Sequence, residues 1–325
     1  MSKFSKYFNV GLLIVLLGLL GFGATHSRQI LDYFALRNYQ PSSRVVELAN
    51  VTTMNDKTRN VFYVNHPDLQ TKQQFAGSCT QQEQTIVLGC FITNDGIFLL
   101  DVSDPRLQGV VEVTTAHEVL HAMYDRLSGD EKKHVDQMTA DFFSKITNQR
   151  IKDNIENYRQ KDPSVVPNEL HSILATEIRD LSPELEQYYA KYFKDRKAIV
   201  IFSEKYEQTF IDIENQVKAY DMQLKSLKSE IDAKEAQINN LGVRIDSERS
   251  RLDNLRKSNK VAEYNAEVEG YNNLVNEYNR TIKERQALAE HYNAIVDEYN
   301  KLATTESDLI KALKTNDIQP IKGAQ

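Results

Sequence analysis

The chain has 325 residues, of which 41% are hydrophobic and 26% are charged, so it has enough apolar material to fold around a core. Its net charge of -6 argues against a nucleic-acid binder, because such proteins present basic patches to phosphates. Only 2 cysteines are present, which excludes a disulfide-dense scaffold and a four-cysteine zinc site.

The N-terminal residues 1–26 predict a membrane anchor. Lys3 and Lys6 precede the uncharged apolar run Val10–Ala24. This run is short for a bilayer span of about 20 residues and long for a signal-peptide core, and no small-x-small cleavage site ends it. We therefore expect an uncleaved signal anchor, with a cleaved signal as the alternative. Either leaves the basic flank inside and the rest of the chain outside the cytoplasm, at the cell membrane.

Cys79 and Cys90 fit that location. Outside the cytoplasm two nearby cysteines usually pair, so we expect a disulfide between them. Two reduced, buried thiols are the alternative.

The remainder of the chain predicts an α+β domain over residues 27–203, a helical coiled-coil hairpin over 204–312 and a tail over 313–325. In the first domain, Val61–Val64, Ile86–Ile92 and Ile97–Val102 are rich in β-branched and aromatic residues, as strands are. The Asp95-Gly96 pair between the last two predicts a hairpin turn.

Helices are expected to follow these strands. The first should cover Gln108–Leu127, and Asp130 should cap a second that continues to Phe143. Asn168 should cap a third, which carries Glu169–Asp180.

Apolar residues recur every seven positions through residues 217–252, and the five members of a tyrosine column share one register further on: Tyr264, Tyr271, Tyr278, Tyr292 and Tyr299. The polar Arg256–Lys260 separates the two stripes. This pattern predicts two antiparallel helices with facing seams, in which tyrosine rings pack and their hydroxyls stay wet. Such a hairpin can bind a protein partner or a second copy of the chain.

One motif carries chemistry. His117-Glu118-Val119-Leu120-His121 is an HExxH sequence within the first predicted helix. Residues four apart share a helix face, so both imidazoles can reach one Zn²⁺, at about 2.0–2.1 Å. Glu118 lies beside them and can take a proton from a zinc-bound water that attacks a peptide carbonyl. The alternative is two histidines packed structurally on an amphipathic helix.

With this motif the chain resembles the zincin metallopeptidases over roughly residues 85–180. In the gluzincin, or thermolysin-like, branch the third zinc ligand is a Glu within N-E-x-x-S-D. Asn168-Glu169-Leu170-His171-Ser172 matches that pattern except that Ile173 replaces the Asp. The resemblance implies Glu169 as the third ligand, with Glu177 and His171 as rivals. The metzincin branch does not fit, because Leu127 replaces its third His.

The resemblance also implies a peptide or protein substrate, bound in extended form along the strand before the active-site helix, here Ile97–Val102. Tyr158 and His171 are the candidates for stabilising the oxyanion. The sequence thus predicts a membrane-anchored, extracytoplasmic zinc endopeptidase. The alternative is a non-enzymatic envelope protein that works through its coiled coil and retains a degenerate zincin domain.

Overall fold

The computed structural model describes residues 26–79 and 87–315. Two compact units divide the chain, one made of Met1–Gln208 with Leu309–Gln325 and the other of Thr209–Asp308. The first unit contains α2 (Ser43–Val51), α3 (Asp56–Val64), β1 (Asp68–Gln70), α4 (Lys72–Ser78), β2 (Gly89–Ile92), β3 (Gly96–Leu100), a 3₁₀ turn (Pro105–Leu107), α5 (Val110–Asp125), α6 (Gly129–Phe143), α7 (Gln149–Lys161), α8 (Val166–Glu177) and α9 (Pro183–Tyr189). Two long helices, α10 (Arg196–Lys257) and α11 (Val261–Leu313), run from it into the second unit and back.

The sheet in the described residues has three short strands in the order β1-β3-β2. β3 is central, parallel to β1 and antiparallel to β2. The expected hairpin turn is confirmed, since Asn94 and Gly96 adopt positive φ values of 66° and 152° between β2 and β3. Among the described residues β2 pairs with β3 alone, so one edge of β2 is free of strand partners.

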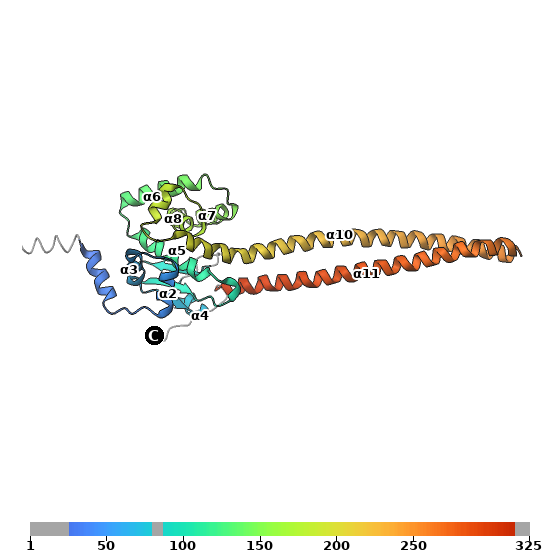
Figure 1. Cartoon of the computed structure of the whole chain (residues 1–325), viewed down its shortest axis with the longest axis horizontal. Helices are drawn as coiled ribbons and strands as arrows, with labels where there is room; N and C mark the ends of the chain where they lie inside the picture. The colour runs from blue at the N-terminus through green and yellow to red at the C-terminus, as the bar shows by residue number, and fades with distance from the viewer. Residues whose placement is uncertain (1–25, 80–86, 316–325) are drawn as a thin grey trace, which may run out of the picture. The chain divides into compact units, whose positions relative to one another are not determined.

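Helix α5 lies against one face of this sheet and packs on α8, α2 and α3 (Figure 1). It is one of the most deeply buried helices of the unit, and the hydroxyls of Thr114 and Thr115 bond back to the carbonyls of Val110 and Val111. Gly109 precedes α5 with φ 102°, and a Cβ there would lie 2.4 Å from the Phe202 carbonyl oxygen. Only glycine permits both that backbone conformation and that close approach.

The expected α+β fold is wrong, because helices dominate the described residues and the strands are few and short. The Val61–Val64 segment, which we expected to be a strand, is the last turn of α3. Asn55 caps α3 by accepting the Thr58 amide, and Val61 and Phe62 fill the core from one helix face. A run of four β-prone residues is too short to distinguish strand periodicity from helix periodicity. The preceding helix cap therefore determines that this segment is helical.

The predicted transmembrane helix and the predicted single-pass location in the cell membrane are not supported. The anchor predicted at residues 1–26 lies almost wholly outside the described residues. Within residues 26–79 and 87–315 no helix combines the length and the apolar character needed to cross a membrane. The long helices α10 and α11 carry charged residues along their whole length.

Two helix caps differ from expectation. Ser128, rather than Asp130, caps α6 through a reciprocal pair of bonds with Glu131. Helix α8 begins at Val166, so Asn168 lies in its first turn, and Pro167 occupies an early position where its missing N–H costs nothing.

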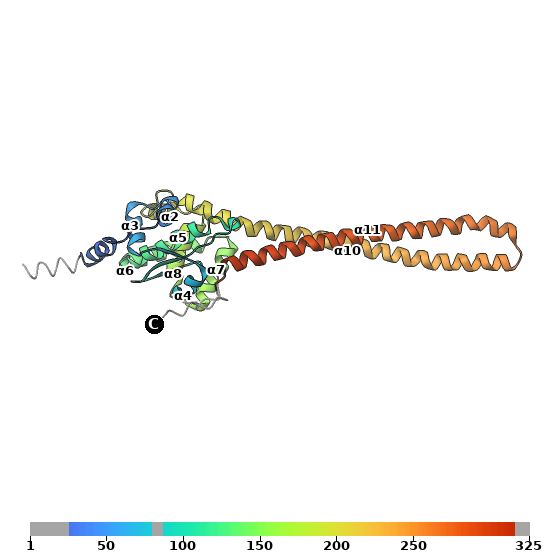
Figure 2. The same cartoon turned by 90° about the horizontal axis from the view of Figure 1, so that it is seen from below.

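The second unit is an antiparallel pair of helices (Figures 1 and 2). The chain reverses between Lys257 and Val261, within the expected polar segment. Leu227, Leu241 and Ile295 are buried in the seam. Every tyrosine of the column defined above is half-buried, as expected for rings that pack while their hydroxyls stay wet.

Polar residues bridge the two helices at the rim of this seam. Lys234, which interrupts one apolar column, bonds to Glu284 at 2.7 Å, and Arg251 bonds to Glu267 at 2.6 Å. Exposed ion pairs contribute little stability each, but they fix which residues face each other.

Candidate metal centre

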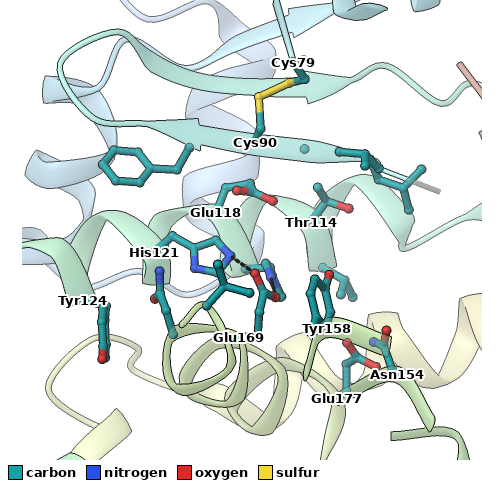
Figure 3. A pocket seen from close by; sticks show the side chains of 18 of the residues that line it. Cys79, Cys90, Thr114, Glu118, His121, Tyr124, Asn154, Tyr158, Glu169 and Glu177 are labelled. Atoms are coloured by element: carbon teal, nitrogen blue, oxygen red, sulfur yellow. Dashed lines mark ion pairs between the residues drawn. A yellow bond between two sulfur atoms is a disulfide. The ribbon is translucent and has the colours of Figure 1, made fainter. Parts of the chain in front are cut away.

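The structure brings His117, His121 and Glu169 together. Their ligand atoms all lie within 4.8 Å of one another. The carboxylate faces both rings, with Oε2 3.4 Å from His117 Nε2 and Oε1 3.6 Å from His121 Nε2 (Figure 3). The histidines are one turn apart on α5, and Glu169 projects from the first turn of α8, which packs directly on α5.

The carboxyl group of Glu169 is held in its charged form. Burial alone would raise its pKa, but the two imidazoles and a hydrogen bond from Tyr158 outweigh burial and keep the pKa below its usual value. A buried carboxylate is therefore available to a cation between the two helices.

The donor set fits a zinc ion. Two imidazole nitrogens and one carboxylate are the protein ligands of a catalytic zinc site that leaves a fourth position open. Glu169 Oε2 is also buried without a hydrogen-bond partner in the described part of the chain. A buried, unsatisfied carboxylate oxygen is costly, and a bound cation would satisfy it.

Glu118 lies against the edge strand β2, next to the histidines on α5 (Figure 3). Its side chain is buried at 5% exposure but borders the cavity. A Cβ added to Gly89 would lie 2.7 Å from Glu118 Cγ and 2.9 Å from its Oε1. The absence of a side chain at Gly89 thus makes the space that Glu118 occupies.

A cavity of about 660 Å³ opens over this cluster. Its walls are β2 on one side and residues of α7, α8 and the start of α10 on the other. Tyr158 lines the cavity beside Glu169 (Figure 3). His171, the other candidate for the oxyanion, is not among the residues that line it.

The rival third ligands have other partners. Glu177 lines the cavity but bonds to Arg150 at 2.8 Å. Arg150 also bonds to Glu207 of α10 at 2.5 Å. Burial would lower the pKa of Arg150, but the two carboxylates outweigh burial and raise it.

His171 is fully buried behind the site, with its Nε2 3.0 Å from the Tyr188 hydroxyl. Burial, followed by the fields of His121 and His117, lowers its pKa to about 3, so the ring is neutral at pH 7. A neutral, enclosed ring turned toward Tyr188 acts as a packing residue.

The strand expected to receive substrate has no unpaired edge. β3, within Ile97–Val102, is paired on both sides, so its backbone groups are not free. Instead β2 borders the cavity through residues 89–92, and its outer edge is unpaired in the described residues. The sequence does not distinguish the two, because strand order depends on the contact between β3 and the distant β1.

The disulfide between Cys79 and Cys90 is confirmed. Cys79 ends α4 and Cys90 lies in β2, and both border the cavity. The bridge therefore ties the edge strand to α4, which packs on β3 and β1.

Several residues in or beside the cavity escape sequence reasoning. Ser172, buried one turn after Glu169, has its Oγ 3.3 Å from His121 Nδ1. Ser203, Tyr206 and Glu207 belong to the long helix α10, whose periodicity indicates only a coiled coil. Gly89 carries a signal in principle, since an isolated glycine in a strand often marks close backbone approach.

Comparison of the chain with protein families, with curated proteins and with solved structures gives no match.

Proposed function

We propose that this chain is a zinc-dependent endopeptidase of gluzincin type. His117, His121 and Glu169 would hold one zinc ion, and Glu118 would act as the general base and acid. The observation that supports this most strongly is the convergence of two imidazoles and a buried carboxylate with one unsatisfied oxygen, at the floor of a cavity.

Zinc bound in this site would supply a Lewis acid that polarises a peptide carbonyl and acidifies a water molecule. Glu118 supplies the proton acceptor, since it borders the cavity from the turn of α5 that carries both histidines. After taking a proton from the attacking water, its carboxyl can pass that proton to the leaving amine. Because Gly89 has no side chain, nothing at that position displaces the carboxyl group of Glu118.

Tyr158 is the candidate for stabilising charge on the substrate oxygen. It lines the cavity and donates a hydrogen bond to Glu169. Its single O–H can donate to a developing oxyanion only after leaving Glu169, which a bound zinc ion would then hold, and this exchange makes Tyr158 a candidate for that role.

The edge of β2 that has no strand partner among the described residues is where an extended peptide would bind. Its N–H and C=O groups could pair with a substrate backbone as an added strand, while side chains of the substrate enter the cavity. The substrate class is therefore an unfolded or extended segment of peptide or protein.

The test is zinc stoichiometry followed by a single substitution. Full-length protein should hold about one zinc per chain by elemental mass spectrometry, and His117→Ala should lose it. Glu118→Gln should keep zinc but lower cleavage of a quenched peptide library about 10²–10⁴-fold, the usual contribution of a general base. A chain that takes up no zinc, or a Glu118→Gln variant that cleaves normally, would contradict the proposal.

A further inference from the structure

The second nitrogen of each zinc-binding imidazole needs a partner, because that partner sets which nitrogen carries the proton. A neutral imidazole has one proton, and the metal requires the lone pair of the nitrogen it binds. For His121 the nitrogen turned toward Glu169 is Nε2, so the proton must reside on Nδ1.

Ser172 lies at that other nitrogen. Its Oγ is 3.3 Å from His121 Nδ1, and the residue is fully buried. Ser172 follows Glu169 by three residues on α8, so both side chains share the helix face that packs on α5. One helix face therefore contacts both nitrogens of the same ring.

We infer that Ser172 is a positioning residue for the metal site: its hydroxyl accepts a hydrogen bond from the Nδ1–H of His121, which leaves the Nε2 lone pair free to bind the metal. This inference rests on the proposed zinc function and adds a residue to it. The observation that carries it is the geometry around one buried ring, with a carboxylate at one nitrogen and a hydroxyl at the other.

Ile173, the residue after Ser172, cannot be the hydrogen-bond partner of His121 Nδ1. Ile173 packs in an apolar cluster with Ile151 and Ile155 of α7. A carboxylate at position 173 would be buried among hydrocarbon side chains, at a high desolvation cost. The hydroxyl of Ser172 instead gives His121 an acceptor without adding another negative charge beside Glu169.

The chain offers a matched control for a substitution at Ser172. Thr176, one turn further along α8, is also fully buried, and its hydroxyl donates to the backbone carbonyl of Ser172 at 2.9 Å. Thr176→Val therefore removes a buried hydroxyl from the same helix without removing the partner of His121.

The experiment measures the zinc dissociation constant of the full-length protein by competition with a chromophoric chelator. Ser172→Ala should weaken zinc binding about 10- to 100-fold, the usual effect of losing the partner of a ligating His. Ser172→Thr, which keeps a hydroxyl, should bind within about 3-fold of wild type, and Thr176→Val should match wild type.

An unchanged dissociation constant in Ser172→Ala overturns the inference while leaving the zinc function standing. An equal loss in Thr176→Val also overturns it, because the effect would then be general damage to α8. Failure of the wild-type chain to bind zinc overturns the proposed function and this inference together.

A second measurement needs no variant. In the zinc-loaded wild-type protein, NMR should show a slowly exchanging Nδ1 proton on His121 with a nuclear Overhauser effect to the β-protons of Ser172. A fast-exchanging Nδ1 proton without that contact would overturn the inference, even if Ser172→Ala does not fold.

Discussion

Gly89 and Glu118 are in direct apposition: a Cβ at position 89 would overlap the Glu118 side chain, at 2.7 Å from Cγ. The edge strand and the general base proposed here therefore fit together only while residue 89 has no side chain. The apposition links the binding edge of the cavity to the group that would move the proton.

Gly89→Ala should lower kcat by about 10²-fold, because a shift of about 1 Å in a reacting group can cost that much. Zinc content should be unchanged, since the three atoms nearest to such a Cβ belong to Thr114 and Glu118 and not to the candidate ligands. Steady-state kinetics with elemental analysis checks both. Gly270→Ala is the control, because a Cβ there meets nothing within 4 Å; a normal kcat in Gly89→Ala would show that Glu118 has room to move.

The assignment of Glu169 over its rivals is tested by replacing each candidate with glutamine, which is isosteric with the two glutamates. Glu169→Gln should lose zinc, since the amide has no negative charge and ligates weakly. Glu177→Gln and His171→Gln should keep about one zinc per chain, because these side chains are bonded to Arg150 and Tyr188 instead. Zinc retained in Glu169→Gln, or lost in Glu177→Gln, would reassign the third ligand.

Arg196 stabilises the helix that carries Glu169. Its buried guanidinium donates to the carbonyls of Ala175, Ile178 and Arg179, which end α8, and pairs with Glu186 of α9. Glu186 is partly exposed, so removing Arg196 mainly leaves the three carbonyls without a donor, and each unsatisfied buried group costs about 1–3 kcal/mol. Arg196→Met should therefore destabilise the protein by about 3–5 kcal/mol, measured by chemical denaturation.

The Arg196–Glu186 pair also makes the stability of the folded protein depend on pH. A hydrogen bond from Arg196, the largest cause, lowers the pKa of Glu186 below its ordinary value of 4.5. The stability that ionised Glu186 contributes to the folded protein is therefore complete above pH 4.5. It is lost as the pH falls below that value, because the unfolded chain then takes up the proton first. Glu186→Gln should flatten the fall in stability below pH 4.5, whereas Glu184→Gln, at an exposed position of α9, should not.

The disulfide should contribute both stability and substrate binding. It closes a loop with a sequence separation of 11, so its removal should cost about 2–3 kcal/mol through loop entropy. Because Cys90 lies in the edge strand, the double variant Cys79→Ser, Cys90→Ser should raise KM more than it lowers kcat. Equal kinetics in reduced and oxidised protein would show that the bridge serves stability alone.

Two excisions of the helical hairpin that differ by a few residues at each end should affect the first unit differently. Replacing residues 209–308 by a short flexible linker should leave the first unit folded, zinc-bound and active on a short peptide, because these residues form the separate second unit. A wider excision of 204–312 should lose activity, since it removes Tyr206 and Glu207 from the cavity wall and the buried Leu309. Similar behaviour of both would show that the start of α10 does not shape the cavity.

Features encoded within a short stretch of chain could be predicted. The Asp95-Gly96 turn, the helix bearing His117 and His121, and the reversal near Lys257 each depend on neighbouring residues, and the structure has them where expected. Glu169 is implied by the resemblance to the gluzincin pattern, and the structure brings it to the histidines because α8 packs on α5.

Features that depend on distant contacts could not be predicted. Val61–Val64 has strand-like composition, but its helix is set by the Asn55 cap and by burial against α5. In the described part of the chain the outer edge of β2 is unpaired because β1 pairs with β3, and no local pattern encodes that pairing. Ser172 near His121 and Glu207 near Arg150 are likewise contacts between segments more than 50 residues apart in sequence.

The last turn of α11 has a consequence for how the protein is made. Leu309 and Leu313 are buried in the first unit, and the Lys72 ammonium group of α4 reaches the Lys311 carbonyl. During synthesis the ribosome produces α5 and α8 well before these residues, with residues 209–308 in between. The first unit therefore cannot complete its core until the whole hairpin has emerged, so a truncated nascent chain would carry the HExxH helix in an unfinished fold.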